Sequence, residues 1–201
     1  MIPLPDFHFS QFPPFSSMKG LVKKSRVVIV GGSFAGLKSV RHLAEKSHVT
    51  LIEPREYFEY TPGILPLLCG EGGEDILITP LNRCVKNARV VNGYFQGLNA
   101  EEKRCIVKDV DGSISEIEYD YLILAVGRPY ATPIRPSSQA LSIPLRVREL
   151  KELRVRVQGS KNIVVRGGGL VGVELAAELA CRVEPRPRIK LISRSALLSG
   201  L

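Results

Sequence analysis

The chain has 201 residues, 28 basic and 20 acidic side chains, and a hydrophobic content of 44%. This length suits one domain or two small ones with enough apolar residues for a packed core, and the composition excludes a fibrous or disordered chain. No stretch approaches the roughly 18 consecutive apolar residues of a membrane span, which predicts a soluble protein without a transmembrane segment.

The charge is distributed unevenly along the chain. Residues 1–120 carry 14 basic and 15 acidic side chains, whereas residues 121–201 carry 14 and 5. A basic half indicates either an anionic partner or a contribution of the charge to solubility. The chain has 7 Phe, 6 Tyr and no Trp, without the run of aromatic and arginine residues that would stack bases. A phosphate-bearing small molecule is therefore favoured over nucleic acid.

Four cysteines stand singly, at positions 69, 84, 105 and 181, far from the 3 histidines. This spacing predicts isolated buried thiols, no metal site and a reducing compartment. Residues 1–17 contain no Lys or Arg, so they resemble neither a secretory signal nor a transit peptide. We expect a flexible leader over residues 1–24 and a cytoplasmic location by default, with membrane-surface or organellar association left open.

The first motif begins directly after this leader. Residues 26–30 form a short apolar, β-branched run that predicts a strand buried on both faces. The strand leads into the glycine-rich turn 31–36 and then into a helical stretch with apolar residues on one face. Residues 48–52 predict a second strand, so that the whole segment is a βαβ unit.

The middle of the chain is less regular. Residues 62–80 contain four glycines and are predicted to be rich in loops. Residues 105–110 and 114–119 flank Asp111-Gly112 and predict a β-hairpin. Residues 121–125 predict another buried strand, which Gly127 ends.

The βαβ pattern then returns. Residues 128–144 carry four prolines and read as a connector, and residues 145–157 are compatible with a basic helix. A strand at 162–165, a glycine-rich turn, a helix at 173–181 and a strand at 189–192 follow. The two turns lie 136 residues apart (Gly31 to Gly167), which indicates two copies of one nucleotide-binding architecture.

Each glycine of such a turn has a physical task. The first makes the tight strand-to-helix turn, the second admits the phosphates to the helix N-terminus, and the third lets the helix pack on the strand. In the second copy Gly167, Gly169 and Gly172 fill all three positions. In the first copy Gly31 and Gly36 fill two, and Ser33 replaces the middle glycine.

Polar residues near the two turns suggest which nucleotide each would bind. Glu53 ends the second strand, 22 residues after Gly31, where a carboxylate can accept hydrogen bonds from ribose hydroxyls. The alternative is a solvated acid at a strand end. The second copy has Ser193-Arg194 at the equivalent place, which favours NADPH over NADH unless Arg194 is simply solvated. Glu174, in the first turn of the second helix, is either a catalytic residue for positioning or proton handling, or part of an exposed face.

Together these segments resemble the flavoproteins with two dinucleotide-binding domains, in particular type II NADH:quinone oxidoreductases and the apoptosis-inducing-factor-like (ferroptosis suppressor) branch. The matching segments are VVIVGGSFAGL (27–37), VTLIEPREYFEYTP (49–62), YDYLILAVG (119–127) and NIVVRGGGLVGVELAAELA (162–180). The resemblance implies that the first unit binds FAD and the second NAD(P)H. The cofactor-binding residues it implies are Gly31, Gly32, Ser33, Phe34, Ala35, Gly36, Glu53, Pro54, Arg55, Thr61, Pro62, Ala125, Gly127, Gly167, Gly169, Gly172, Ser193 and Arg194.

The resemblance also implies a fold and a reaction. The expected fold is α/β and Rossmann-like, a parallel sheet with helices on both faces plus a small β-meander. Residues 25–135 would be the FAD-binding part, 136–160 a connector and helix, and 161–201 the start of an incomplete NAD(P)H-binding domain that leans on the first. Such enzymes pass hydride from NAD(P)H to FAD and electrons on to a quinone or similar small acceptor. No CxxxxC pair occurs, which disfavours the disulfide-reductase branch.

Two other readings remain open. The chain is shorter than members of that family, so it is alternatively a non-catalytic fragment that associates through an exposed apolar sheet edge. A basic nucleic-acid-binding protein is the third reading, and it rests on the charge of residues 121–201 alone.

Overall fold

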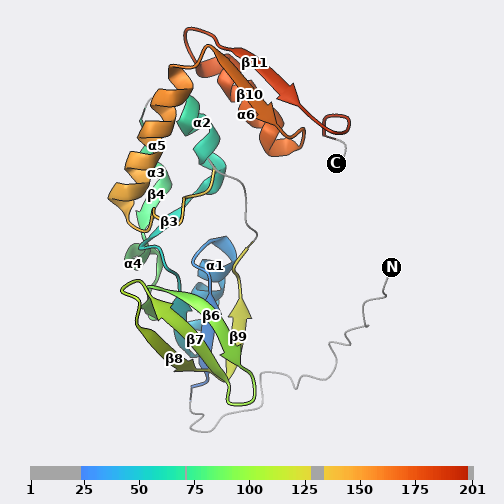
Figure 1. Cartoon of the computed structure of the whole chain (residues 1–201). Coiled ribbons are helices and arrows are strands. Elements are labelled where there is room, and N and C mark those ends of the chain that lie inside the picture. Colours follow the sequence, from blue (N-terminus) through green and yellow to red (C-terminus); the bar gives the residue numbers. More distant parts are fainter. Residues whose placement is uncertain (1–23, 71, 128–133, 199–201) are drawn as a thin grey trace.

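The structure is a computed structural model that describes residues 24–70, 72–127 and 134–198 (Figure 1). All of the predicted leader except Lys24 lies outside the described residues, as do residues 128–133 of the predicted connector.

The first sheet is parallel, with the strand order β5-β2-β1-β9. Its strands are β1 (Arg26–Val30), β2 (His48–Ile52), β5 (Arg89–Val91) and β9 (Tyr121–Leu124). The predicted strands at 26–30 and 48–52 are confirmed, and residues 27–30 are each at most 4% exposed. The strand predicted from residue 121 exists, but it lies at the sheet edge. Tyr121 and Leu124 are 62% and 56% exposed, so the prediction that it is buried is wrong.

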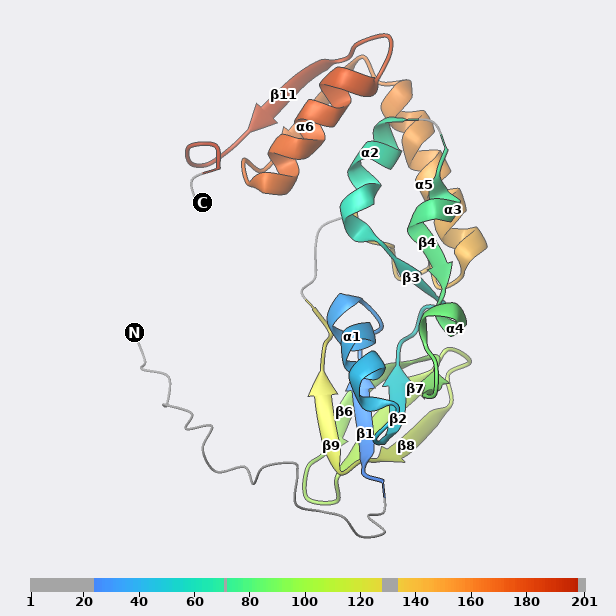
Figure 2. The ribbon, with the colours of Figure 1, turned by 180° about the vertical axis from the view of Figure 1, so that it is seen from behind.

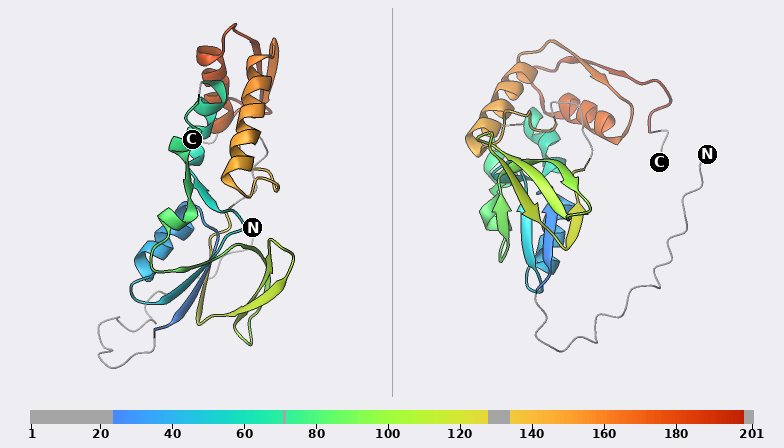
Figure 3. Two further views of the ribbon diagram at one scale, coloured as in Figure 1. Left: turned by 90° about the vertical axis from the view of Figure 1, so that its left-hand side faces the viewer. Right: turned by 60° about the horizontal axis from the view of Figure 1, so that its bottom comes forward.

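Different structures cover the two faces of this sheet. Helix α1 (Phe34–Leu43) covers one face, where Val40 packs with Val27 and Ile29. The opposite face carries an antiparallel sheet of β6 (Gly93–Asn99), β7 (Arg104–Asp109) and β8 (Ile114–Glu118). Figure 3 shows α1 and this β-meander on opposite sides of the parallel sheet. A meander, rather than a helix, therefore covers the second face, and the hairpin predicted around Asp111-Gly112 is confirmed.

The segment predicted to be rich in loops, 62–80, is mostly regular, so that prediction is wrong. It belongs to a run made of β3 (Tyr57–Glu59), the 3-10 turn η2 (Thr61–Gly63), α2 (Ile64–Cys69), α3 (Glu74–Leu77), β4 (Ile78–Pro80) and α4 (Leu81–Cys84). Pro66 is tolerated in α2 because the first-turn N–H groups of a helix have no intrahelical acceptor. Five of the six α2 side chains are buried, so the helix shows no amphipathic pattern.

The C-terminal part repeats the βαβ unit. It consists of α5 (Ile143–Gln158), β10 (Asn162–Arg166), α6 (Leu170–Arg182) and β11 (Arg188–Ile192), with β10 and β11 parallel. The predicted helix at 145–157 is confirmed and starts earlier, because Ser142 caps it by accepting a hydrogen bond from the Leu145 N–H. The predicted second strand–helix–strand repeat is confirmed as well.

The second unit does not form a core by itself. Leu150 of α5, Leu179 of α6 and Val165 of β10 are buried in one cluster with Leu67 and Leu68 of α2. Figure 2 shows α6 and β11 beside α2 and α5, away from α1 and the first sheet. The helix that sequence patterns missed therefore provides the surface on which the second unit packs.

A buried ion pair joins α5 to β3. Arg146 is 0% exposed, and its guanidinium binds the carboxylate of Glu59 through two contacts, Nε–Oε2 at 2.6 Å and Nη2–Oε1 at 3.2 Å. Its Nη1 donates to Glu149 at 2.8 Å, and its Nη2 donates to the Ile134 carbonyl at 3.0 Å. Burial, the largest single influence, lowers the pKa of Arg146, but the hydrogen bonds and charges of Glu59 and Glu149 together outweigh burial, so the pKa is raised.

The cysteines are all free. Cys69 and Cys105 are buried, Cys84 is half-buried and Cys181 is exposed, so the expectation of buried thiols is wrong for Cys181. Burial raises the pKa of Cys69 to about 11. Within the described ranges, no cluster of three or more His, Cys, Asp or Glu side chains is arranged to hold a metal ion, and no helix has the length and apolar character to cross a membrane.

Candidate dinucleotide sites

The first glycine turn lies at the carboxyl end of β1, where the backbone permits only glycine. Gly31 has a φ of +106°, in the left-handed region, and its N–H donates to the Ile52 carbonyl at 2.9 Å. A Cβ at Gly31 would lie 2.4 Å from the Ala125 carbonyl oxygen, and one at Gly36 would lie 1.7 Å from that of Gly31. The turn is therefore in close contact with Ala125, directly after β9, on one side and with the start of α1 on the other.

Glu53 holds this turn in place. Its side chain is almost entirely buried, and its Oε2 accepts a hydrogen bond from the Gly32 N–H at 2.7 Å. Its Oε1 accepts from the Nε and the backbone N–H of Arg55, at 2.7 Å and 3.2 Å. A carboxylate has about four lone-pair positions, so three of them are used within the protein and roughly one is free for a ligand hydroxyl. The alternative of a solvated acid at a strand end is thereby excluded.

A cavity of about 160 Å³ opens beside the turn. The residues that line it are Gly31, Gly32, Ser33, Phe34, Ala35, Glu53, Arg55, Tyr57, Phe58, Glu59, Thr61, Ala125, Val126, Gly127, Arg135 and Pro136. No side chain in the described part of the chain caps α1, so the N–H groups of its first turn face this cavity with the positive end of the helix dipole.

The cavity collects most of the residues predicted for the first site. Three predicted residues are not on its lining: Gly36 lies beneath the turn, and Pro54 and Pro62 are elsewhere. Six lining residues were not predicted, namely Tyr57, Phe58, Glu59, Val126, Arg135 and Pro136. Those on β3 lie within the segment 49–62 that carried the family resemblance, whereas Arg135 had no local signal.

Two cations make the cavity suitable for an anion. Arg55 is paired with Glu53. Burial is the largest single influence and lowers the pKa of Arg55, but the hydrogen bond to Glu53 and the neighbouring negative charges together outweigh burial, so the pKa is raised. Arg135 is half-buried near Gly127 and forms no ion pair with any residue that the structure describes. An unpaired guanidinium beside a helix N-terminus favours a phosphate-bearing ligand.

The second glycine turn reproduces the first in detail. Gly167 has a φ of +128°, and its N–H donates to the Ile192 carbonyl at 2.8 Å. A Cβ at Gly172 would lie 1.9 Å from the Gly167 carbonyl oxygen. A Cβ at Gly168 would meet the Ser193 side chain, as one at Gly32 would meet Glu53. Ser193 therefore stands at the position that Glu53 has in the first unit.

The second turn is open on one side. A Cβ at Gly167 or Gly169 would have no other atom within 4 Å among the described residues, because β10 pairs only with β11 there. Arg194 and Glu174 are both exposed. Helix α6 begins at Leu170, earlier than predicted, so Glu174 lies beyond its first turn and the prediction that it belongs to that turn is wrong. Glu174 is also not on the lining of the first cavity.

Two glycine turns, each between a parallel strand and a helix, define a Rossmann-like fold of the dinucleotide-binding oxidoreductases. A family model described as pyridine nucleotide-disulphide oxidoreductase matches residues 25–195, and the chain belongs to this family. Homologues in the family bind FAD and NAD(P)H, which are the two cofactors that the resemblance implied.

Individual relatives agree with the family assignment. The chain is 28% identical over 169 residues to apoptosis-inducing factor homolog A of Dictyostelium discoideum, covering 84% of this chain and 40% of that protein. It is 25% identical to the demethylphylloquinone reductase NdbB of Synechocystis, covering 85% and 46%. Among solved structures, NDH2 from Plasmodium falciparum in complex with RYL-552 has a TM-score of 0.70 at 21% identity, covering 88% and 43%.

The chain thus spans less than half the length of these curated relatives. The range that the family model matches, 25–195, includes both glycine turns and the strands that flank them.

Proposed function

We propose that this chain supplies the cofactor-binding part of an FAD-dependent NAD(P)H oxidoreductase that passes hydride from NAD(P)H to FAD and electrons on to a quinone-like acceptor. The observation that carries this proposal is the first glycine turn, which Glu53 holds beside an uncapped helix N-terminus. Relatives named as a demethylphylloquinone reductase and an NAD(P)H-ubiquinone oxidoreductase support a quinone as acceptor.

The residues of the first cavity fit FAD. Gly31, Ser33 and the first-turn N–H groups of α1 would hold the pyrophosphate, with Arg135 supplying positive charge. The remaining lone pair of Glu53 would accept a hydrogen bond from the adenosine ribose. Thr61 would lie on the flavin side. The flavin supplies the hydride and electron chemistry when it is bound, and the protein orients it.

The second turn would hold the nicotinamide nucleotide. Gly167, Gly169 and Gly172 leave its backbone accessible, and Glu174 would position the nicotinamide or handle a proton. Because Ser193 stands where a carboxylate would repel a 2′-phosphate, and Arg194 follows it, we propose a preference for NADPH over NADH.

The division into units and the location also stay proposals. We propose an FAD part at 25–135, a connector and helix at 136–160 and the start of the NAD(P)H part at 161–201. The location proposed is the cytoplasm, and quinone reduction would bring the protein to a membrane surface.

Absorption spectroscopy of the purified chain tests the proposal. We expect flavin bands near stoichiometric occupancy, or their appearance after incubation with FAD and gel filtration, and bleaching by NADPH under nitrogen. A colourless chain that also takes up no FAD would contradict it. It would favour the alternative, a non-catalytic fragment that associates through β9, which sedimentation at several concentrations would reveal.

Nucleotide preference depends on Arg194. Replacing it by alanine, Arg194→Ala, should weaken NADPH binding by about tenfold, since a charge-assisted hydrogen bond to a phosphate contributes roughly 1.5 kcal/mol or more. NADH binding should change by less than about twofold. Titration followed by nicotinamide fluorescence measures both affinities. Arg188→Ala, at the opposite end of β11, is the matched control. Equal losses for NADPH and NADH would contradict the preference.

A further inference from the structure

A groove runs along the flank of α1, separate from both glycine turns. One part, of about 690 Å³, lies between α1 and α4, and a second part, of about 610 Å³, continues toward the start of β2. The two parts share Ala44, Glu45 and Asn87 on their linings, so they form one continuous surface. We call it the α1 groove.

Positive charge lines the α1 groove throughout. Its six cations are Lys24, Lys38, Arg41, Arg83, Lys86 and Arg89. Glu45 is the single acid on the two linings. The groove lies in the half of the sequence that is almost neutral overall, so these cations are concentrated by the fold.

Among the residues that the structure describes, these cations have no anionic partners. None of the six forms an ion pair with a residue in the described ranges, whereas other surface arginines do, such as Arg104 with Glu116 and Arg182 with Glu178. Lys24 donates to the Glu45 carbonyl and leaves that carboxylate unused. Like charges gathered without counter-charges repel one another, and binding of a polyanion would relieve this repulsion.

The floor of the groove is apolar. The apolar surface that a ligand can reach there comes from the half-buried side chains of Leu37 and Phe58, because Val40 and Ala44 are almost fully buried beneath them in the core. At the end nearest the first cavity the ring of Phe34, 48% exposed, packs edge-on against Phe58, with ring centroids 5.2 Å apart. The groove therefore offers an apolar floor between charged rims.

We propose that the α1 groove binds an acidic amphipathic segment of a partner protein. Six cations spread over two adjoining cavities call for several negative charges along an extended ligand, more than one small anion carries. The apolar floor calls for aliphatic side chains between those charges. An acidic segment with interspersed leucines or similar residues satisfies both requirements.

The shape of the groove disfavours other polyanions. A planar anionic membrane would contact the charged rims but not the half-buried Leu37 and Phe58. A single-stranded nucleic acid needs several exposed aromatic faces for base stacking, whereas Phe34 and Phe58 are the only Phe, Tyr or Trp side chains on the linings of the two described cavities.

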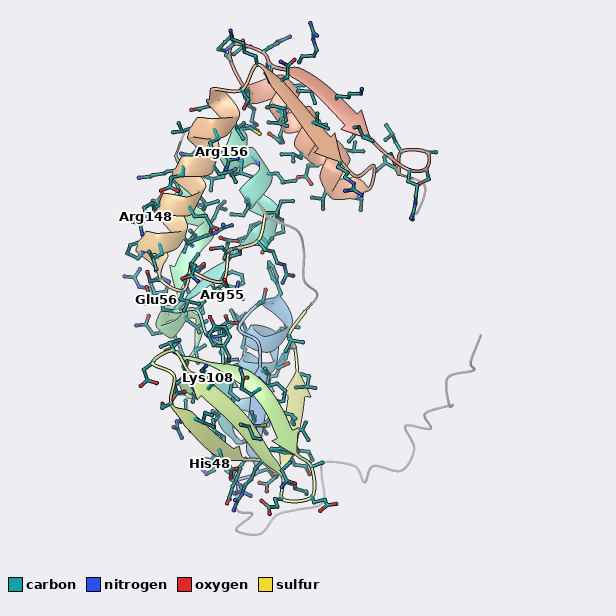
Figure 4. All side chains as sticks on the ribbon, viewed as in Figure 1. His48, Arg55, Glu56, Lys108, Arg148 and Arg156 are labelled. Carbon is teal, nitrogen blue, oxygen red and sulfur yellow. The ribbon has the colours of Figure 1, made fainter. Side chains whose placement is uncertain are left out.

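Fluorescence anisotropy with a synthetic, dye-labelled peptide of alternating glutamates and leucines, about twelve residues or roughly 18 Å long as a helix, tests the proposal. The double variant Arg41→Glu/Lys86→Glu should weaken binding to the full chain by about tenfold, since it removes two attractions and adds two repulsions. The control Arg148→Glu/Lys151→Glu makes the same charge change on the exposed side of α5, where Figure 4 shows Arg148 pointing away from the protein. It should change the affinity by less than about twofold.

Circular dichroism and flavin content, measured on every variant, separate this proposal from the proposed function. If the glutamate variant does not fold, the milder Arg41→Gln/Lys86→Gln takes its place. Equal weakening by both charge reversals would show non-specific attraction and overturn the proposal. It would also be overturned if the groove variant lost binding to phosphatidylserine vesicles or to a single-stranded oligonucleotide while its affinity for the peptide was unchanged.

Discussion

Replacing Gly36 by alanine should abolish FAD binding and lower the free energy of unfolding by about 4 kcal/mol or more. Losses of this size are exceptional and arise from severe conflicts such as a clash with the backbone. The added Cβ would lie 1.7 Å from the Gly31 carbonyl oxygen, a backbone atom that no side-chain rotation can move. The start of α1 would have to shift away from β1, and the turn that faces the first cavity would shift with it. Urea denaturation of the FAD-free chain measures the stability, and flavin absorbance measures the binding.

A second glycine provides the control for this effect. Gly97 lies in β6, and a Cβ there would meet no other described atom within 4 Å. Gly97→Ala should therefore change the free energy of unfolding by less than about 1 kcal/mol. Comparable loss in the two variants would mean that the Gly31–Gly36 contact does not govern the turn.

Replacing Arg146 by methionine should lower the free energy of unfolding by about 3–5 kcal/mol, because it leaves the buried carboxylate of Glu59 without a partner. Glu59 lies on the lining of the first cavity, so the same change should also weaken FAD binding. The ion pair with Glu59, which connects α5 to β3, would be lost as well. The hydrogen bonds of Arg146 to Glu149 and to the Ile134 carbonyl would be lost with it.

Two further variants identify the origin of that loss. Arg148→Met changes an exposed arginine on the same helix and should alter stability by less than about 1 kcal/mol. The double variant Arg146→Met/Glu59→Leu removes both charges and should recover most of the stability, because apolar residues of similar size can replace a buried pair. No recovery would place the effect in packing rather than in the uncompensated charge.

Local sequence patterns predicted the elements whose neighbours are close in the chain. The runs 26–30 and 48–52 are apolar and β-branched, and a glycine-rich turn joins the first of them to an amphipathic helix, so each element has its own signal. Helix α2 had none: glycines flank it, a proline lies in its first turn and both its sides are buried. Its burial comes from α5 and α6, more than 70 residues further along the chain.

The same distinction between local sequence signals and contacts made by distant segments applies to the candidate sites. Motif spacing identified Gly31, Glu53 and Gly167, because each stands at a fixed position within its own strand–turn–helix–strand unit. It could not show that Glu53 bonds to the Gly32 N–H, nor that Arg135 faces the same cavity, since both facts depend on segments brought together by folding. The exposure of β9 was likewise unpredictable, because an apolar strand does not reveal whether a neighbour covers it.

The end of β9 also affects how long a ligand should stay bound at each of the two glycine turns. The Ala125 carbonyl closes one side of the turn at Gly31, whereas nothing in the described chain stands in that place beside Gly167. A ligand at the first turn must break contacts with more segments before it departs, so its residence should be long. A ligand at the second turn has fewer contacts to break and should exchange quickly. The proposed function needs one cofactor that stays bound and one nucleotide that exchanges, and β9, which lies beside the first turn, would provide that difference.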